Sequence, residues 1–162
     1  MTTPTVPDYY QSPRLEVAEV IPALSARILD VGCAAGALGE ELKRRGAKEV
    51  VGLEKFQAAA AVARTRLDAV HEVDLNTLPS LPYPDGHFDV LVFADVLEHL
   101  VEPVSVLKHF LRYLMPDGRV ILSLPNVRHE SVVLPLLVDG RWQYQDMGIM
   151  DRTHLRFFTL RE

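Results

Sequence analysis

The feature that most constrains the fold is a glycine-bearing turn between a strand-like run and a helix-like run. Residues 28–31 (Ile-Leu-Asp-Val) are apolar apart from one acid, and Gly32 and Gly36 then bracket three small residues. The run 37–45 that follows is amphipathic at helical spacing. Because glycine has no side chain and tolerates positive φ, such a loop lets a ligand approach the main chain and the free N–H groups of a helix start. The stretch therefore predicts a strand, a tight ligand-binding loop and a helix.

Strand-like and helix-like runs alternate along most of the chain. Residues 88–93 are almost continuously apolar, which is typical of a strand buried on both faces of a parallel sheet. The expected strands are residues 27–31, 50–53, 70–73, 88–93 and 120–124. The expected helices are residues 13–21, 37–45, 56–67 and 103–114, the last with Val104, Leu107, Leu111 and Leu114 on its apolar face and with Pro116, Asp117 and Gly118 as its stop. This alternation predicts an α/β fold with a mainly parallel sheet and helices on both faces.

Composition limits the class of protein. The chain has 162 residues, a net charge of −5 and one cysteine, Cys33. These values favour one cytoplasmic domain without a disulfide and without an electrostatic affinity for nucleic acid. No apolar run approaches the roughly 20 residues of a membrane-spanning helix. We divide the chain into an N-terminal arm and helix, residues 1–25, and a ligand-binding domain, residues 26–162.

Three kinds of ligand suit a glycine loop after a strand: a nucleotide phosphate, a dinucleotide or S-adenosylmethionine. A P-loop is excluded because no Gly-Lys-Ser/Thr occurs. A dinucleotide loop reads Gly-x-Gly-x-x-Gly, whereas here Gly32, Gly36 and Gly39 are spaced differently. The carboxylate of Asp30 would repel a pyrophosphate but attract an ammonium group. S-adenosylmethionine carries an ammonium and a sulfonium cation and no phosphate, so it fits best.

The run Asp30-Val-Gly-Cys-Ala-Ala-Gly36 resembles motif I of class I S-adenosylmethionine-dependent methyltransferases. The resemblance implies a Rossmann-like fold and contacts of the cofactor, or of its product S-adenosylhomocysteine, with this loop and with residues at the following strand ends. Glu54 falls where the family binds the ribose hydroxyls, and Asp74 with Leu75 where it addresses the adenine. The cofactor-binding residues expected on this basis are Asp30, Gly32, Cys33, Ala34, Gly36, Glu54, Lys55, Asp74, Leu75 and Asp95.

The end of the chain departs from that family. Members continue into two further strands after the fifth, and this chain ends before them, so we expect the last C-terminal strands of the sheet to be missing. Thr159-Leu-Arg-Glu162 matches a capping box, which marks a helix start. We interpret the chain as the larger part of a domain that ends where another helix begins, with a frayed polar tail as the alternative. An incomplete sheet edge favours a homodimer.

The acceptor side is expected to involve Glu98, His99 and His154 as catalytic residues. The segment Leu97-Glu-His-Leu100 resembles ubiquinone-type O-methyltransferases and small-RNA 2′-O-methyltransferases, in which Glu and His, with a later histidine, bind a divalent cation. By that analogy, Asp95, Glu98, His99 and His154 form a metal site. The favoured alternative has no metal, and Glu98 and His99 then hydrogen-bond locally and shape the acceptor pocket. With or without a metal, His99 is the expected general base.

Several other residues carry weaker predictions. Tyr9, Tyr10 and Arg14 are candidates for a lid over the cofactor, and Asn126 for orienting an acceptor. Arg156 is expected to pair with Asp151. Trp142 and Tyr144 suit a hydrophobic flap, but burial in the core is the favoured expectation for both.

Taken together, these residues predict an S-adenosylmethionine-dependent methyltransferase that acts on a small molecule or a sugar, with O-methylation as the reaction. The runs Leu124-Pro-Asn-Val-Arg-His129 and Gly148 to Thr159 also resemble methyltransferases found with cell-surface glycan enzymes, which adds a glycan to the candidate acceptors. The alternatives are an NAD-binding oxidoreductase and a catalytically silent S-adenosylmethionine-binding module.

Overall fold

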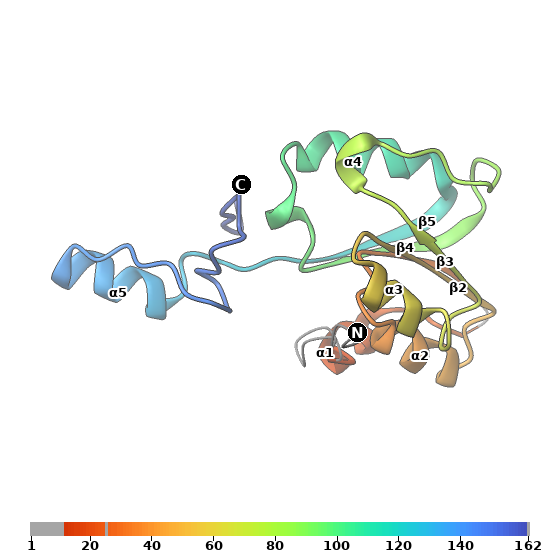
Figure 1. Ribbon diagram of the computed structural model, residues 1–162, viewed down its shortest axis with the longest axis horizontal. Coiled ribbons are helices and arrows are strands. Elements are labelled where there is room, and N and C mark those ends of the chain that lie inside the picture. The colour runs from red at the N-terminus through yellow and green to blue at the C-terminus, as the bar shows by residue number, and fades with distance from the viewer. Residues whose placement is uncertain (1–11, 25, 162) are drawn as a thin grey trace, which may run out of the picture.

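A computed structural model describes residues 12–24 and 26–161. Its centre is a sheet of five parallel strands in the order β3-β2-β1-β4-β5 (Figure 1). The strands are β1 Arg27–Val31, β2 Glu49–Glu54, β3 Ala69–Glu72, β4 Phe88–Ala94 and β5 Leu114–Ser123. The helices are α1 Leu15–Val20, α2 Ala37–Arg44, α3 Gln57–Ala63, α4 Pro103–Phe110 and α5 Glu130–Asp139, with short 3-10 turns η2 Leu75–Thr77, η3 Leu97–His99 and η4 Leu111–Tyr113. The predicted α/β class with a parallel sheet is confirmed.

Helices cover both faces of the sheet, and each face has its own hydrophobic core. Side chains alternate along β1, so that Ile28 and Leu29 point to opposite faces. On the face of Ile28 the core includes residues of α1, α2 and α3, and on the face of Leu29 it includes residues of α4 and η4 (Figure 1). Because α1 packs in the same core as α2, the division of the chain after residue 25 stays a prediction.

The strand order reverses between β1 and β4. The chain runs outward from β1 to β3 and then returns to place β4 on the other side of β1. In open parallel sheets, ligands bind outside the carboxyl ends of the strands at such a reversal. Here the Gly32 loop follows β1 and η3 follows β4, so both predicted halves of the site lie at this point.

Two predictions around α4 were wrong. The buried residues of α4 are Val106 and Phe110, whereas Val104 is 60% exposed, because the helix turns its Val106 face toward the core. The Pro116–Gly118 turn does not end a helix. It lies within β5, in an irregular register between the pairs Phe88–Leu114 and Val90–Arg119, so the strand begins six residues earlier than expected.

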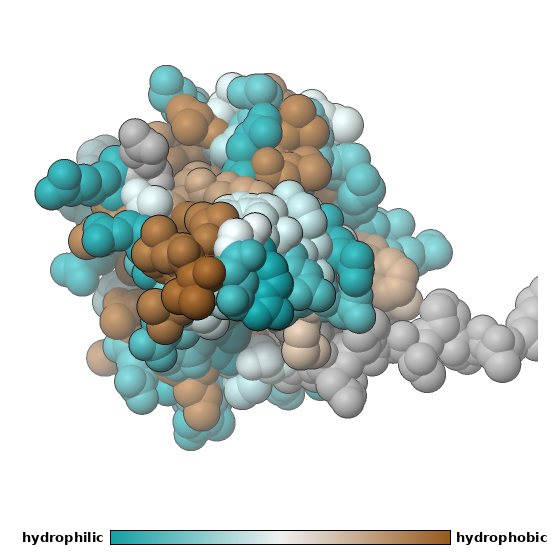
Figure 2. Space-filling model, turned by 90° about the vertical axis from the view of Figure 1, so that its left-hand side faces the viewer, coloured by the Kyte–Doolittle hydropathy of each residue, from teal (hydrophilic) through white to brown (hydrophobic). Residues whose placement is uncertain are grey.

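The helix α5 was not predicted, and it projects away from the sheet (Figure 1). It is apolar around most of its circumference, yet Val132 is its one buried residue and Leu137 is 75% exposed. Figure 2 faces this end of the molecule and shows hydrophobic side chains gathered there. Trp142 and Tyr144, which follow α5, are 43% and 42% exposed, so the prediction that they lie in the core was wrong. Among the helices described, none has the length and apolar character needed to cross a membrane.

Within residues 12–24 and 26–161, no sheet strand follows β5, in line with the expected lack of the last strands. Two isolated bridges, Asn126 with Phe158 and Gln145 with Asp151, organise the segment after it. At the end, the hydroxyl oxygen of Thr159 accepts a hydrogen bond from the N–H of Arg161 within a turn. Glu162 and the candidate lid residues Tyr9 and Tyr10 lie outside the described residues.

Candidate functional site

The loop between β1 and α2 is a tight turn with three residues at positive φ. These are Gly32 at 77°, Ala34 at 49° and Gly36 at 78°. The N–H groups of Gly32 and Cys33 donate to the carbonyl of Leu53 at 2.8 and 2.9 Å, which ties the loop to the end of β2. A Cβ on Gly32 would lie 2.4 Å from a methyl group of Val96, so glycine is required for both conformation and space. The sequence suggested the first reason but not the contact with Val96.

Asp30 is a buried acid at the end of β1. It is 2% exposed, and its Oδ2 has no hydrogen-bond partner among the described residues. Burial, and then the nearby charge of Glu54, raise the pKa of this carboxyl to about 7. A buried carboxylate without a partner is costly, so the position favours a ligand that brings a positive charge or a donor.

Glu54 links the end of β2 to the glycine loop. Its Oε2 accepts from the N–H of Ala34 at 3.0 Å, and its Oε1 accepts from the N–H of Phe56 at 2.6 Å. The side chain is therefore fixed at the carboxyl edge of the sheet. Each carboxylate oxygen retains a further lone pair that can accept from a hydroxyl of a ligand.

The residues after β2 and β3 form a more exposed group. Lys55 Nζ lies 2.7 Å from Asp74 Oδ2, and Asp74 also accepts from the N–H of Asn76 as the cap of η2. Hydrogen bonds from Lys55 and Asn76 hold the pKa of the Asp74 carboxyl below its usual value. Leu75 is buried in the core beside it. Cys33 is buried, and burial raises the pKa of its thiol, so the side chain packs in the core; its contact with the cofactor stays a prediction.

Asp95 follows β4 with a positive φ of 55°. Its carboxylate pairs with the guanidinium of Arg14 and accepts from the hydroxyl of Ser123 at 3.1 Å. Arg14 also donates to that hydroxyl oxygen at 3.0 Å. A residue at the start of α1 is thus anchored at the carboxyl ends of β4 and β5, beside the predicted site.

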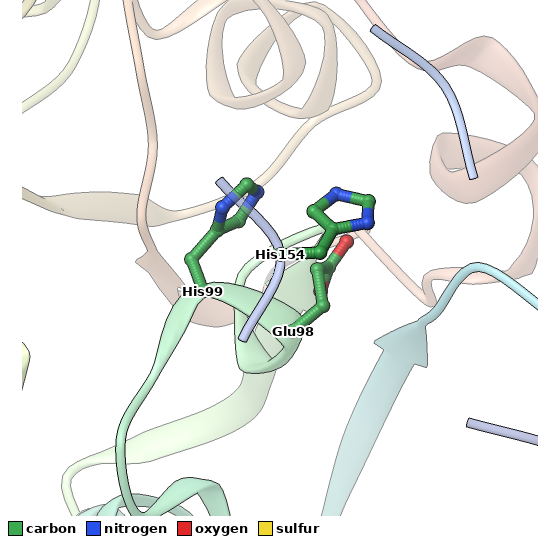
Figure 3. A group of neighbouring side chains, drawn as sticks. All are labelled: Glu98, His99 and His154. Atoms are coloured by element: carbon green, nitrogen blue, oxygen red, sulfur yellow. The ribbon is translucent and has the colours of Figure 1, made fainter. Parts of the chain in front are cut away.

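Glu98, His99 and His154 come together next to this edge (Figure 3). One ligand atom of each side chain lies within 4.8 Å of the others. Figure 3 shows Glu98 and His99 on adjacent positions of η3 and His154 on the later segment, with the carboxylate and the rings directed to a common region. Asp95, the fourth residue of the predicted metal site, is engaged with Arg14 and is not in this group.

Glu98 and His154 are buried, and His99 is partly buried. Glu98 is 1% exposed, its Oε2 has no hydrogen-bond partner in the described part of the chain, and burial raises its pKa to about 7. Burial and the neighbouring His154 lower the pKa of His99. His154 is 8% exposed, and the two imidazole rings meet edge to face with centroids 4.8 Å apart. The group therefore resists carrying several charges at once, which suits a general base or a set of neutral metal ligands.

Main-chain hydrogen bonds bring the two segments together. The carbonyl oxygen of Glu98 accepts from the N–H of Leu155 at 2.7 Å and of Arg156 at 3.1 Å. The Nδ1 of His154 lies 3.0 Å from the carbonyl oxygen of Ile149, and the Nδ1 of His99 lies 3.3 Å from that of Thr153. Thr153 was not singled out in the sequence, because a contact 54 residues away leaves no local signal.

Aromatic side chains extend outward from the histidine pair. Phe157 contacts the rings of His154, Trp142 and Tyr144, with centroids 6.4, 5.3 and 6.2 Å away. The predicted Arg156–Asp151 pair is wrong. The guanidinium of Arg156 donates to the carbonyl oxygen of Val101, and the carboxylate of Asp151 accepts from Thr153. Asn126, a candidate for orienting an acceptor, accepts from the N–H of Arg128.

Comparison with known proteins places these features in context. The family described as "Methyltransferase domain" matches residues 6–162. A ubiquinone biosynthesis O-methyltransferase of Alkalilimnicola ehrlichii is 36% identical over 126 residues, which are 75% of this chain and 51% of that protein. A ubiquinone biosynthesis O-methyltransferase of Pseudomonas aeruginosa is 36% identical over 62% of this chain and 44% of its own length. The chain thus spans about half the length of these curated relatives.

Solved structures support the fold. An S-adenosylmethionine-dependent methyltransferase from Archaeoglobus fulgidus superposes with a TM-score of 0.69 over 93% of this chain and 64% of its own, at 21% identity. At this identity, the likeness concerns the fold alone.

Proposed function

This chain belongs to the methyltransferase-domain family, and on that basis we propose that it is a class I S-adenosylmethionine-dependent enzyme that methylates an oxygen of a small-molecule acceptor. One observation carries the proposal. The glycine loop with Asp30 and Glu54 lies on one side of the strand reversal, and the group Glu98, His99 and His154 lies on the other. The proposed donor site and acid–base group thus lie at the same strand reversal, where open parallel sheets bind ligands.

The residues of the donor side fit the cofactor. Asp30 offers a buried, unpartnered carboxylate oxygen to the ammonium group, and Glu54 has free lone pairs for ribose hydroxyls. At Gly32 the main chain carries no side chain, which leaves it accessible to a ligand; a Cβ there would collide with Val96. We place Ala34, Gly36, Leu75, Asp74 and Lys55 around the same ligand, as the family pattern implies. When bound, S-adenosylmethionine supplies a methyl group on a sulfonium and leaves as S-adenosylhomocysteine.

The residues of the acceptor side can take the proton that an oxygen nucleophile must lose. Burial and His154 keep His99 neutral near pH 7, so a ring nitrogen is available as a base. Glu98 and His154 beside it are buried, and low local polarity strengthens a hydrogen bond to an incoming hydroxyl. We therefore assign His99 as the general base, with Glu98 and His154 as catalytic partners.

Two measurements test this function. Calorimetric titration with S-adenosylmethionine should show binding, while NAD should give none; the reverse result would reinstate the oxidoreductase alternative. Transfer of a labelled methyl group into phenolic or sugar acceptors then separates an enzyme from a silent binding module. His99→Ala should abolish transfer and leave cofactor affinity unchanged, and a variant that keeps full turnover would remove the base assignment.

A divalent cation held by Glu98, His99 and His154 is the second candidate. Both histidines have Nδ1 beside a main-chain carbonyl oxygen, which can only accept, so each ring carries its proton there and keeps a lone pair on Nε2. Such a cation would supply Lewis-acid activation of the acceptor hydroxyl. Zn²⁺ and Mn²⁺ are the probes, because imidazole and carboxylate suit both.

Metal analysis of protein purified without chelator tests the second candidate. Binding of Zn²⁺ or Mn²⁺ by calorimetry should disappear in His154→Ala and persist in His129→Ala, whose ring accepts from the N–H of Ser131 in the cap of α5. If metal binding persists in His154→Ala, or if the unaltered chain binds no metal, the second candidate is wrong and His99 acts as a base without a metal.

Three finer proposals accompany this function. An acceptor related to ubiquinone biosynthesis is suggested by the names of the relatives, and a glycan by the sequence resemblance. A homodimer through the open edge of β5 is testable by mass measurement in solution. We also propose a cytoplasmic location, on the evidence of the single free cysteine.

A further inference from the structure

The loop before His154 carries a hydrogen-bonded chain that ends on His99. The carboxylate oxygen Oδ1 of Asp151 lies 2.6 Å from the hydroxyl oxygen of Thr153 and also accepts from the N–H of Thr153 at 2.7 Å. The same hydroxyl oxygen lies 3.1 Å from Nδ1 of His99. Asp151, Thr153 and His99, which come from two segments far apart in the sequence, are therefore connected by consecutive hydrogen bonds.

The direction of each hydrogen bond follows from the donors available. A carboxylate can only accept, so the Thr153 hydroxyl donates its single proton to Asp151. The hydroxyl oxygen can then only accept from His99, and so can the carbonyl oxygen of Thr153, which lies 3.3 Å from the same nitrogen. Both contacts demand a proton on Nδ1 of His99, and the lone pair is left on Nε2.

We infer that Asp151 and Thr153 are positioning residues that fix the tautomer and orientation of His99. This inference rests on the proposed function for its purpose, since a base or a metal ligand needs a fixed lone pair, but its geometry stands without it. Outer partners of this kind commonly set the tautomer of a functional histidine.

The state of Asp151 supports this direction. Burial acts to raise the pKa of its carboxyl, but the hydrogen bonds from the Thr153 hydroxyl and N–H outweigh burial and lower it. The carboxyl therefore stays ionised at neutral pH and holds the hydroxyl proton. The loop is itself anchored, because the N–H of Gln145 donates to the carbonyl oxygen of Met150 at 2.8 Å and the N–H of Arg152 to that of Gln145 at 3.0 Å.

The test is nitrogen NMR of the histidine rings in the protein alone, without cofactor, acceptor or metal, with the His99 signal assigned by its loss in His99→Asn. The unaltered chain should show His99 as one neutral tautomer with its proton on Nδ1. Thr153→Val should add a population of the second tautomer, because it removes the acceptor at 3.1 Å and leaves only the longer contact of 3.3 Å with the main-chain carbonyl oxygen. Asp151→Ala should add the second tautomer as well, because it frees the hydroxyl proton to point at Nδ1. Thr153→Ser keeps the hydroxyl and should restore the single tautomer.

The matched control is Thr65→Val, whose hydroxyl donates to the carbonyl oxygen of Val62 and has no contact with His99. Circular dichroism of each variant confirms folding, and Thr153 is exposed, so loss of its hydroxyl is tolerated. In transfer assays, Thr153→Val should lower kcat roughly 10- to 100-fold with unchanged cofactor affinity. A proton on Nε2 in the unaltered chain, or an unchanged tautomer in both variants, overturns the inference. Absence of methyl transfer with the expected NMR shift overturns the proposed function alone.

Discussion

Replacement of Gly32 by alanine offers the sharpest test of the geometry at the donor loop. Its φ of 77° costs an L-residue about 1–2 kcal/mol. The added Cβ would also lie 2.4 Å from Cγ2 of Val96, and overpacking of a tight site adds about 1–3 kcal/mol. We therefore expect Gly32→Ala to lower the free energy of unfolding by about 2–5 kcal/mol.

A matched substitution separates strain from collision. Gly86 has a φ of 72°, but a Cβ there would meet its nearest neighbour at 3.7 Å, which is an ordinary contact. Gly86→Ala should therefore cost only the about 1–2 kcal/mol of backbone strain. Both substitutions reduce the entropy of the unfolded chain equally, so this contribution cancels in the comparison.

Urea unfolding of both variants gives the two free energies of unfolding, provided that the dependence of this free energy on urea concentration is the same in both. Val96→Ala, added to Gly32→Ala, removes the colliding methyl group and should recover most of the difference, with a coupling energy of about 0.5–3 kcal/mol in a double-mutant cycle. Equal costs for Gly32→Ala and Gly86→Ala, or a cycle with no coupling, would refute the reasoning that Val96 sets the space in the loop.

Three further predictions concern charge. Glu54→Gln should weaken S-adenosylmethionine binding at least about tenfold by calorimetry, because charged hydrogen bonds contribute about 1.5–3 kcal/mol, whereas Glu49→Gln at the other end of β2 should leave it unchanged. The pKa of Asp30 is about 7 in the folded chain and about 4 in the unfolded chain, so its contribution to stability is complete below about pH 4 and is lost as the pH rises through 7. Asp30→Asn without ligand should thus be more stable than the unaltered chain at pH 8, by up to about 4 kcal/mol in urea unfolding, and a less stable variant contradicts this. Lys55→Ala should change the free energy of unfolding by less than about 1 kcal/mol, since Lys55 is 70% exposed and exposed ion pairs contribute little; a larger thermal shift would show a role beyond the pair.

The parts of the fold that sequence predicted are those with a local cause. The strand 27–31 was predicted with its observed bounds, because an apolar run that ends at glycine has few alternatives. The bulge at Pro116–Gly118 was not predicted. A turn signal in the sequence does not reveal whether the strand continues on both sides of it, as β5 does beside β4. The sequence of the exposed helix α5 has only a weak amphipathic pattern and contains Pro135. Both features argue against a helix, so the sequence did not predict one.

The two sides of the candidate site also differ in how far the sequence predicts them. Asp30, Gly32 and Glu54 occupy the ends of adjacent strands, so topology alone brings them together once the strands are recognised. His154 lies beside Glu98 through contacts between segments far apart in the sequence, among them the two N–H groups of the later segment that donate to the carbonyl oxygen of Glu98.

Glu98 thus has two roles on the proposed acceptor side. Its main-chain carbonyl holds the later segment, and its carboxylate points into the group that it forms with His99 and His154. A substitution of the side chain leaves the two main-chain bonds intact, so the position of His154 and the chemistry of the group can be varied separately. The proposed donor side has no such separation, because Glu54 holds the loop with the same carboxylate that we propose binds the ligand. Substitutions at Glu54 should therefore alter loop order and ligand affinity together, whereas those at Glu98 should alter chemistry with the loops in place.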